Sequence, residues 1–174
     1  MITTILIPTD GSEHAKKAID LGGDLATKYG AKVVLMHVLL RGRVPEGLLR
    51  AAEAEHVGHV PKRTAQNLAI YPQEIFARNR KGEGSMLPVD VLQFIARQIT
   101  SAAESTLRAK GVETIETLVR EGDPGEAILA GAETTKADMI VLGRRGLSNL
   151  RGLMIGSVSQ KVSALAPCTC VTVT

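Results

Sequence analysis

Aromatic residues are scarce in this chain, making up only 2% of its 174 residues, and tryptophan is absent. A platform that stacks single-stranded nucleic acid needs several exposed rings. The formal net charge of +3 is also well below that of a typical nucleic-acid-binding domain. We therefore expect no nucleic-acid partner.

Cysteines and long apolar runs are few as well. The two cysteines, Cys168 and Cys170, lie two residues apart in an apolar run. They supply neither a disulfide framework nor a four-ligand zinc set, and we expect both to be small buried hydrophobic residues. No apolar run reaches the roughly 18 residues of a membrane span, and the N-terminus lacks the basic segment of a signal peptide. We expect a cytosolic protein with no membrane partner.

The common nucleotide and nucleophile motifs are missing. There is no G-x-x-x-x-G-K-[ST] phosphate loop, and "IPTDGS" stands where a G-x-G-x-x-G would follow the first strand. No serine or cysteine lies in a nucleophile elbow beside a recognisable base. The sequence favours a binding protein over an enzyme.

Short apolar runs alternate with amphipathic segments. The pattern predicts strands at 2–8, 32–40, 114–119, 137–143 and 168–173. It predicts helices at 12–29, 89–109, 121–136 and 157–166, with Ser12 and Asp123 as N-caps. This alternation is typical of right-handed βαβ units. We predict an α/β fold: an open five-stranded parallel sheet of Rossmann-like type, in the order 3-2-1-4-5, with helices on both faces.

Two of the predicted helices have a clear apolar stripe. In the first it is Ala15, Ala18, Ile19, Gly22, Leu25, Ala26 and Tyr29; in the second it is Leu92, Ile95, Ile99, Ala103 and Thr106–Leu107. We expect both stripes to face the sheet.

The chain is long enough for one domain, which we place at 1–174, with an insertion at about 41–87. The insertion holds eight basic and five acidic residues and is interrupted by prolines. A short helix at 46–58 is expected within it. The segment is suited to a lid, to a surface for a protein partner or to partial disorder.

A glycine-rich stretch with three arginines, "GRRGLSNLRGLMIGS", links the fourth strand to the last helix at 143–157. In the predicted sheet this loop and the one after the first strand line the crevice at the switch point. Gly143 and Gly146 can bring backbone N–H groups close to an anion, and Gly156 and Ser157 begin a helix whose free amides favour phosphate. Asp10, across the crevice, can accept hydrogen bonds from ribose hydroxyls.

Each of these features also has a simpler interpretation. The glycine-rich stretch can be a flexible connector, and Asp10 can be a capping or Asx-turn residue. His37, inside an apolar strand, favours a hydrogen-bonded core histidine over a base. His56 and His59 are three residues apart but have no third metal ligand beside them.

The spacing of Gly143, Gly146, Gly156 and Ser157 resembles the G-2x-G-9x-G-(S/T) motif of the universal stress protein family. The blocks "ILIPTDGSEHAKKAIDLGGDLA", "VVLMHV", "EGDPGEAILAGAETTKADMIVLGRRG" and "GSVSQKVSALAPCTCVTV" resemble that family in order and spacing. The resemblance covers about 1–40 and 111–174. It implies an adenine nucleotide alpha hydrolase-like fold and the ATP-binding branch of the family.

Carried over position by position, the resemblance implies a complete set of nucleotide contacts. Asp10 would hold the ribose, and Pro8 and Val38 would flank or hydrogen-bond the adenine. The phosphates and ribose would be wrapped by Gly143, Arg144, Arg145, Gly146, Leu147, Ser148 and Asn149, and the phosphate tail held by Gly156, Ser157 and Val158. Mg²⁺ would accompany the nucleotide, although the sequence shows no dedicated carboxylate pair for it.

The resemblance also implies a homodimer, formed through the last strand as a sheet edge. Two functional hypotheses follow. In one, adenine-nucleotide occupancy regulates conformation or partner choice in a stress response. In the other, nucleotide binding is vestigial and the 41–87 insertion is a docking surface for a protein.

Overall fold

The computed structural model describes residues 1–39, 89–147 and 155–174, and the side chains of 89–91 are not among those described. The predicted insertion, with His56, His59 and the helix at 46–58, therefore lies outside the described residues. So do two of the predicted site residues, Ser148 and Asn149.

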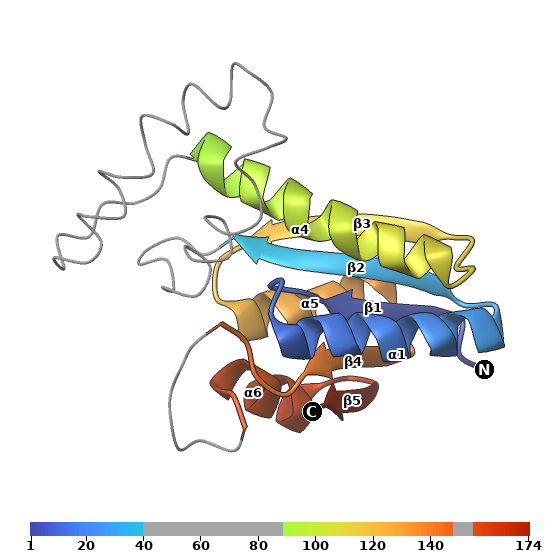
Figure 1. Ribbon diagram of the computed structural model, residues 1–174. Helices are drawn as coiled ribbons and strands as arrows, with labels where there is room; N and C mark the ends of the chain where they lie inside the picture. Colours follow the sequence, from blue (N-terminus) through green and yellow to red (C-terminus); the bar gives the residue numbers. More distant parts are fainter. Residues whose placement is uncertain (40–88, 148–154) are drawn as a thin grey trace, which may run out of the picture.

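A five-stranded parallel sheet forms the centre of the molecule, and the predicted strand order is confirmed (Figure 1). The strands lie in the order β3-β2-β1-β4-β5, and every neighbouring pair is parallel. The strands are β1 (Thr4–Pro8), β2 (Lys32–Leu39), β3 (Ile115–Glu121), β4 (Met139–Gly143) and β5 (Thr169–Val173). Each lies within two residues of its predicted bounds.

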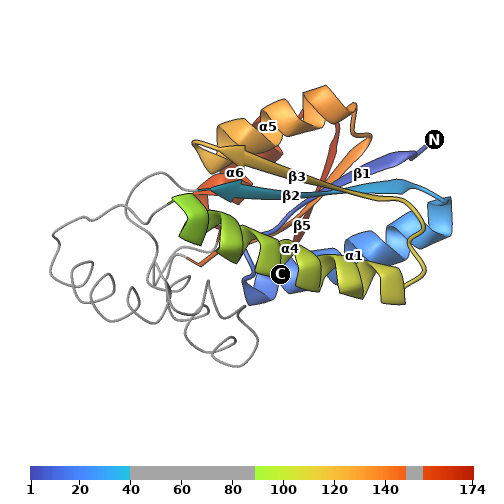
Figure 2. The same ribbon diagram turned by 90° about the horizontal axis from the view of Figure 1, so that it is seen from above.

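Helices cover both faces of the sheet, as predicted. They are α1 (Glu13–Tyr29), α4 (Val89–Ala109), α5 (Pro124–Thr135) and α6 (Ser157–Leu165). Seen from above, α1 and α4 lie on one face and α5 and α6 on the other (Figure 2). Helix α4 is therefore the crossover helix between β2 and β3.

The central strand β1 is buried along its whole length. Its side chains alternate between two cores: Ile5 and Ile7 pack beneath α1 and α4, and Leu6 packs beneath α5 and α6. Removing each such side chain from water contributes about 1.5–3 kcal/mol. Because these strands are covered on both faces, they read in the sequence as continuous apolar runs.

The ends of α1 are those that the sequence predicts. The Ser12 hydroxyl accepts the Ala15 N–H, and Gly30 closes the helix in the left-handed region at φ 62°. The predicted stripe is wrong at Tyr29, whose ring is 48% exposed. The predicted Gly22 is buried, Leu25 is half-buried, and Gly23, which the stripe did not include, is also buried.

The buried face of α4 also differs from the prediction. Ala96, Thr100, Ala103 and Leu107 are buried, whereas Thr106 is exposed and the predicted Leu92, Ile95 and Ile99 are half-buried. Small side chains at the centre of the contact let α4 approach the sheet closely. The larger aliphatic side chains flank that contact.

The two edges of the sheet are less covered than its centre. β3 forms one edge with mostly exposed side chains, and β5 forms the other with half-buried ones. In the described part of the chain, no helix has the length and apolar character needed to cross a membrane.

Helix α5 supplies a test of local stability. Asp123 is its N-cap and accepts the Glu126 N–H at 3.0 Å. We expect Asp123→Ala to lower the free energy of unfolding by about 1 kcal/mol, measured by urea denaturation, because the N-terminal amide loses its acceptor. Asp123→Asn keeps an acceptor and should lose less. Asp123 also forms an ion pair with Lys161, at 3.2 Å, and equal losses in the two variants would mean that this ion pair matters more than the cap.

Candidate functional site

The loops after β1 and β4 meet at the carboxyl ends of the strands. The Asp10 carboxylate accepts the Ser12 N–H of its own loop through Oδ1 at 3.0 Å. Its Oδ2 accepts the Leu147 N–H of the second loop, also at 3.0 Å. The structure thus brings two of the predicted site residues, Asp10 and Leu147, into direct contact.

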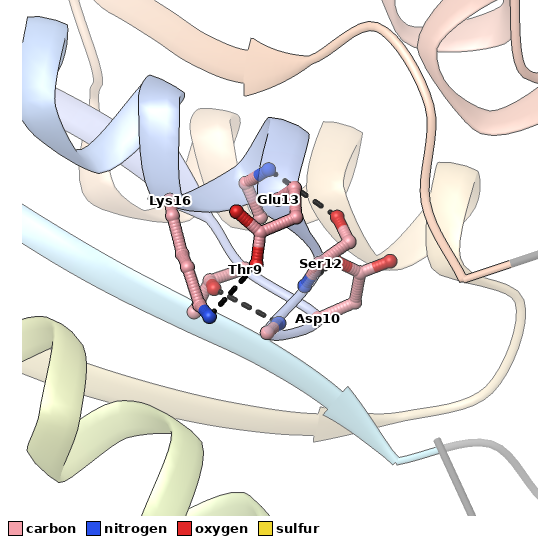
Figure 3. Close-up of polar contacts among 7 residues, drawn as sticks. Thr9, Asp10, Ser12, Glu13 and Lys16 are labelled. Carbon is pink, nitrogen blue, oxygen red and sulfur yellow. Dashed lines mark hydrogen bonds and ion pairs between the residues drawn. The ribbon is translucent and has the colours of Figure 1, made fainter. Parts of the chain in front are cut away.

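A second contact joins the same loops. The buried Ser12 hydroxyl lies 3.4 Å from the Arg145 carbonyl while it accepts the Ala15 N–H. Asp10 itself is directed away from the exposed Glu13–Lys16 ion pair on the first turn of α1 (Figure 3). The N-terminus of α1 and residues 143–147 of the glycine-rich stretch are therefore joined directly at the carboxyl ends of β1 and β4.

Two of the motif's glycines are required by the chain itself. A Cβ on Gly143 would lie 2.7 Å from the His14 carbonyl carbon and 2.9 Å from the Ala15 nitrogen. A Cβ on Gly146 would collide with Asp10 Oδ2. The sequence argument explained both glycines by the approach of an anion. The structure adds an internal reason, the close packing of this loop on α1 and Asp10.

The base of the glycine-rich stretch is closed by backbone hydrogen bonds. The Arg144 carbonyl accepts the Gly156 N–H at 2.9 Å, and the Arg144 N–H donates to Val173 at the end of β5 at 2.7 Å. The Ser159 hydroxyl lies 2.7 Å from the same Arg144 carbonyl and is 3% exposed. The sequence reasoning missed Ser159, whose only signal was its place three residues after the glycine that begins the helix.

Helix α6 begins beside this closure, and no side chain of the described residues caps its first amides. Gly156 is its N-cap and provides no side-chain acceptor, and its first turn holds no acidic residue. Ser157 and Val158 follow in that first turn. The positive end of the helix dipole is therefore available to an anion.

Arg144 and Arg145 are both half-buried at this end of the loop. The Nε of Arg144 is buried and has no hydrogen-bond partner among the described residues. A buried guanidinium N–H without an acceptor is costly, so an anionic acceptor here would be stabilising.

Strand β2 continues past the last residue of β1. Pro8, buried at that end, pairs with Met36, whose carbonyl accepts the Thr9 N–H at 2.8 Å. Backbone groups alternate sides along a strand, so the N–H and C=O of Val38 point to the same side as those of Met36. They face the space beyond β1, next to the Asp10 loop.

His37 is a hydrogen-bonded core histidine, as predicted. It is 5% exposed, and its Nδ1 lies 2.8 Å from the Thr9 carbonyl. Because a carbonyl can only accept, Nδ1 carries the hydrogen. Burial lowers the pKa of His37, with smaller opposing effects from the Thr9 hydrogen bond and the Asp10 charge.

The described residues contain no group of three or more His, Cys, Asp or Glu side chains that could hold a metal ion. Cys168 and Cys170 are free thiols and half-buried, whereas we expected full burial. They pack against the core beneath α5 and α6. Burial raises the pKa of Cys168, so its thiol form is favoured.

An open parallel α/β sheet with a loop-lined crevice at its switch point defines a class of ligand-binding proteins. The family model described as "Universal stress protein family" matches residues 1–174. The chain belongs to the universal stress protein family.

Individual relatives agree with this assignment. The chain is 32% identical over 169 residues to the universal stress protein YxiE of Bacillus subtilis, covering 97% of this chain and 96% of the relative. It is 30% identical over 168 residues to a universal stress protein of Thermus aquaticus, covering 97% and 96%.

Solved structures share the fold. The universal stress protein UspA from Lactobacillus plantarum superposes with a TM-score of 0.69 at 20% identity, covering 99% of this chain and 98% of that one. A universal stress protein in complex with cAMP has a TM-score of 0.59 at 22% identity, covering 99% and 97%. An Archaeoglobus fulgidus protein in complex with dAMP has a TM-score of 0.57 at 18% identity, covering 100% and 98%.

The packing of the loop on α1 can be tested at Gly143. Gly143→Ala should lower the free energy of unfolding by about 1–3 kcal/mol in urea denaturation, because the new Cβ meets backbone that cannot move aside. Gly125→Ala is the matched control. Gly125 lies in α5, where alanine is favoured over glycine, and a Cβ there would meet the flexible Lys161 side chain and the Asp123 carboxylate. An unchanged stability for Gly143→Ala would contradict the packing described here.

Proposed function

We propose that this protein binds ATP or another adenine nucleotide in the crevice between the loops after β1 and β4. The observation that carries the proposal is the contact of Asp10 with the Leu147 N–H. It joins the side chain suited to a ribose with the loop suited to phosphates. In this proposal, occupancy of the crevice regulates the conformation or the partner choice of a cytosolic stress-response protein.

The phosphates would lie at the start of α6. Ser157 and Val158 offer the first amides of the helix there, Gly156 has no side chain to block the approach, and the buried Nε of Arg144 offers a charged donor. The stretch 143–149, including Arg145, Gly146 and the predicted Ser148 and Asn149, would surround the phosphates and the ribose. Mg²⁺ would arrive with the phosphates, a common mode of binding for this ion.

Ribose and base would lie toward β2. Each oxygen of Asp10 already accepts one N–H, and each has a further lone pair for a ribose hydroxyl. The N–H and C=O of Val38 face the same space and can pair with the edge of an adenine, with Pro8 beside them. The cAMP and dAMP complexes of two structurally similar family members support an adenine ligand.

The protein would act by binding, with slow ATP hydrolysis at most. The buried imidazole of His37 already donates to the Thr9 carbonyl, and burial lowers its pKa, which favours the neutral form. A family match over residues 1–174 supports one domain that includes the 41–87 insertion.

We further propose that two copies form a homodimer by pairing their β5 strands. β5 is an edge of the sheet, and an unpaired edge is a template for a second strand. Val173 accepts the Arg144 N–H and so faces β4. Thr172, its neighbour, therefore directs its own N–H and C=O to the free edge.

Nucleotide binding is tested by calorimetric titration of protein freed of co-purified nucleotide. We expect an ATP affinity in the micromolar range, about −8 kcal/mol, and comparison with ADP, AMP and cAMP gives the preference. Gly156→Val should abolish binding, because its Cβ would lie 3.2 Å from the Arg144 carbonyl oxygen and the branched side chain would displace the closed base of the loop beside the phosphate position. Circular dichroism should stay unchanged, because L-residues tolerate the backbone φ of −74° at this position.

Gly125→Ala, at the start of α5, is the control and should bind ATP as the parent protein does. Retained binding in Gly156→Val would place the site elsewhere. Failure of every adenine nucleotide to bind the parent protein would overturn the proposed function.

Dimerisation is tested at Thr172. Thr172→Pro removes a free-edge N–H and leaves the β4–β5 ladder intact, so sedimentation velocity should show a shift from dimer to monomer. Thr172→Val loses only the hydroxyl, which lies 3.1 Å from Ser163 Oγ, and should remain dimeric. A dimer that persists in Thr172→Pro would exclude pairing through β5.

A further inference from the structure

We propose that His37 is the positioning residue for Asp10: its imidazole fixes the peptide before Asp10 and thereby sets the carboxylate over the glycine-rich stretch. The consequence for ligand affinity rests on the proposed nucleotide function. The effect of His37 on the geometry of the loops is independent of that function.

The imidazole is itself held rigidly. His37 lies in β2, which is paired on both sides, by β1 and by β3. Its side chain is 5% exposed, and its Nδ1 donates to the Thr9 carbonyl at 2.8 Å. A buried side chain on an interior strand has little freedom to move, so the carbonyl is bound to a fixed donor.

That carbonyl belongs to the peptide unit that leads into Asp10. A peptide unit is planar and trans, so fixing the direction of the Thr9 C=O also fixes the direction of the Asp10 N–H. Two further bonds hold Thr9: its N–H donates to Met36 at 2.8 Å, and its hydroxyl accepts the Gly11 N–H at 3.3 Å. Figure 3 shows Thr9 and Asp10 side by side in this turn.

Asp10 passes this constraint to the second loop. From the position set by the Thr9 peptide, its Oδ2 reaches the Leu147 N–H and its Oδ1 the Ser12 N–H. One side chain of the core is thus connected to the glycine-rich stretch through a single peptide and a single carboxylate.

Only a hydrogen-bond donor at the position of Nδ1 can hold the Thr9 carbonyl in this direction. Thr9 is 5% exposed, so without His37 its carbonyl would be buried and unpaired. The peptide would then turn toward another donor and carry Asp10 with it. An aliphatic residue fills the space but does not hold the carbonyl.

The test compares three variants. His37→Asn keeps an N–H at the place of Nδ1, whereas His37→Gln carries its amide one bond further out and His37→Leu has none. The first readout is amide hydrogen exchange at Leu147, which needs no ligand. We expect protection to fall about tenfold in His37→Leu and His37→Gln, the effect of losing one hydrogen bond, and to be retained in His37→Asn.

The second readout compares ATP with inorganic triphosphate, which has no ribose for Asp10 to hold. In His37→Leu the dissociation constant for ATP should rise about tenfold, and that for triphosphate less than about twofold. Leu35→Val is the matched control, because Leu35 packs in the core beneath α1 and α4, on the same face of β2 as His37. It should lose stability but neither Leu147 protection nor ATP affinity.

The outcomes separate the two proposals. Equal behaviour of His37→Asn and His37→Leu, or equal loss of ATP and triphosphate, would overturn the role of His37. If the parent protein binds no adenine nucleotide, the proposed function fails, and Leu147 exchange still decides whether His37 positions Asp10.

Discussion

The Asp10 carboxylate is the interaction on which the crevice depends. It accepts N–H groups from Ser12 and from Leu147, the second of which is 137 residues away in sequence. A carboxylate is a strong acceptor for backbone donors, because hydrogen bonds to an ionised group are shorter and stronger than those between neutral groups. The two loops therefore have a defined separation, and the start of α6 has a defined place relative to β2. A ligand entering the crevice meets an arranged surface, which lowers the entropy that binding must overcome.

The fold followed from the sequence because local signals agreed with each other. Apolar runs of strand length, Ser12 and Asp123 before helices, and Gly30 after one all indicated the same elements. The exceptions arose where tertiary packing overrides periodicity. Tyr29 has the phase of the buried face of α1 but lies at its last residue, beyond the cover of the core. In α4, Ala96 and Thr100 are buried because small residues allow the closest approach to the sheet, which a stripe drawn from large aliphatic residues does not reveal.

The position of the candidate site could be predicted from the sequence. The packing contacts that require its glycines could not. A glycine in a sequence can indicate that a Cβ would collide with something at that position. The colliding atoms can belong either to a ligand or to another part of the protein. At Gly143 the structure gives the backbone of α1 as a cause, and at Gly146 it gives Asp10. Ser159 escaped notice because a serine inside a helix has no spacing that marks it. Its partner, the Arg144 carbonyl, is close only after the chain has formed the closed base of the loop.

Arg144 has one more property, which comes from its two backbone bonds. Its N–H donates to the last residue of the edge strand, and its carbonyl accepts from the glycine that begins α6. This one residue is thus hydrogen-bonded both to the β5 edge of the sheet and to the start of α6. If a partner at the sheet edge and a ligand beside α6 each shift Arg144, each must change the affinity for the other by the same factor, because linkage between two binding equilibria is reciprocal. The backbone of Arg144 therefore connects the β5 edge of the sheet with the start of α6.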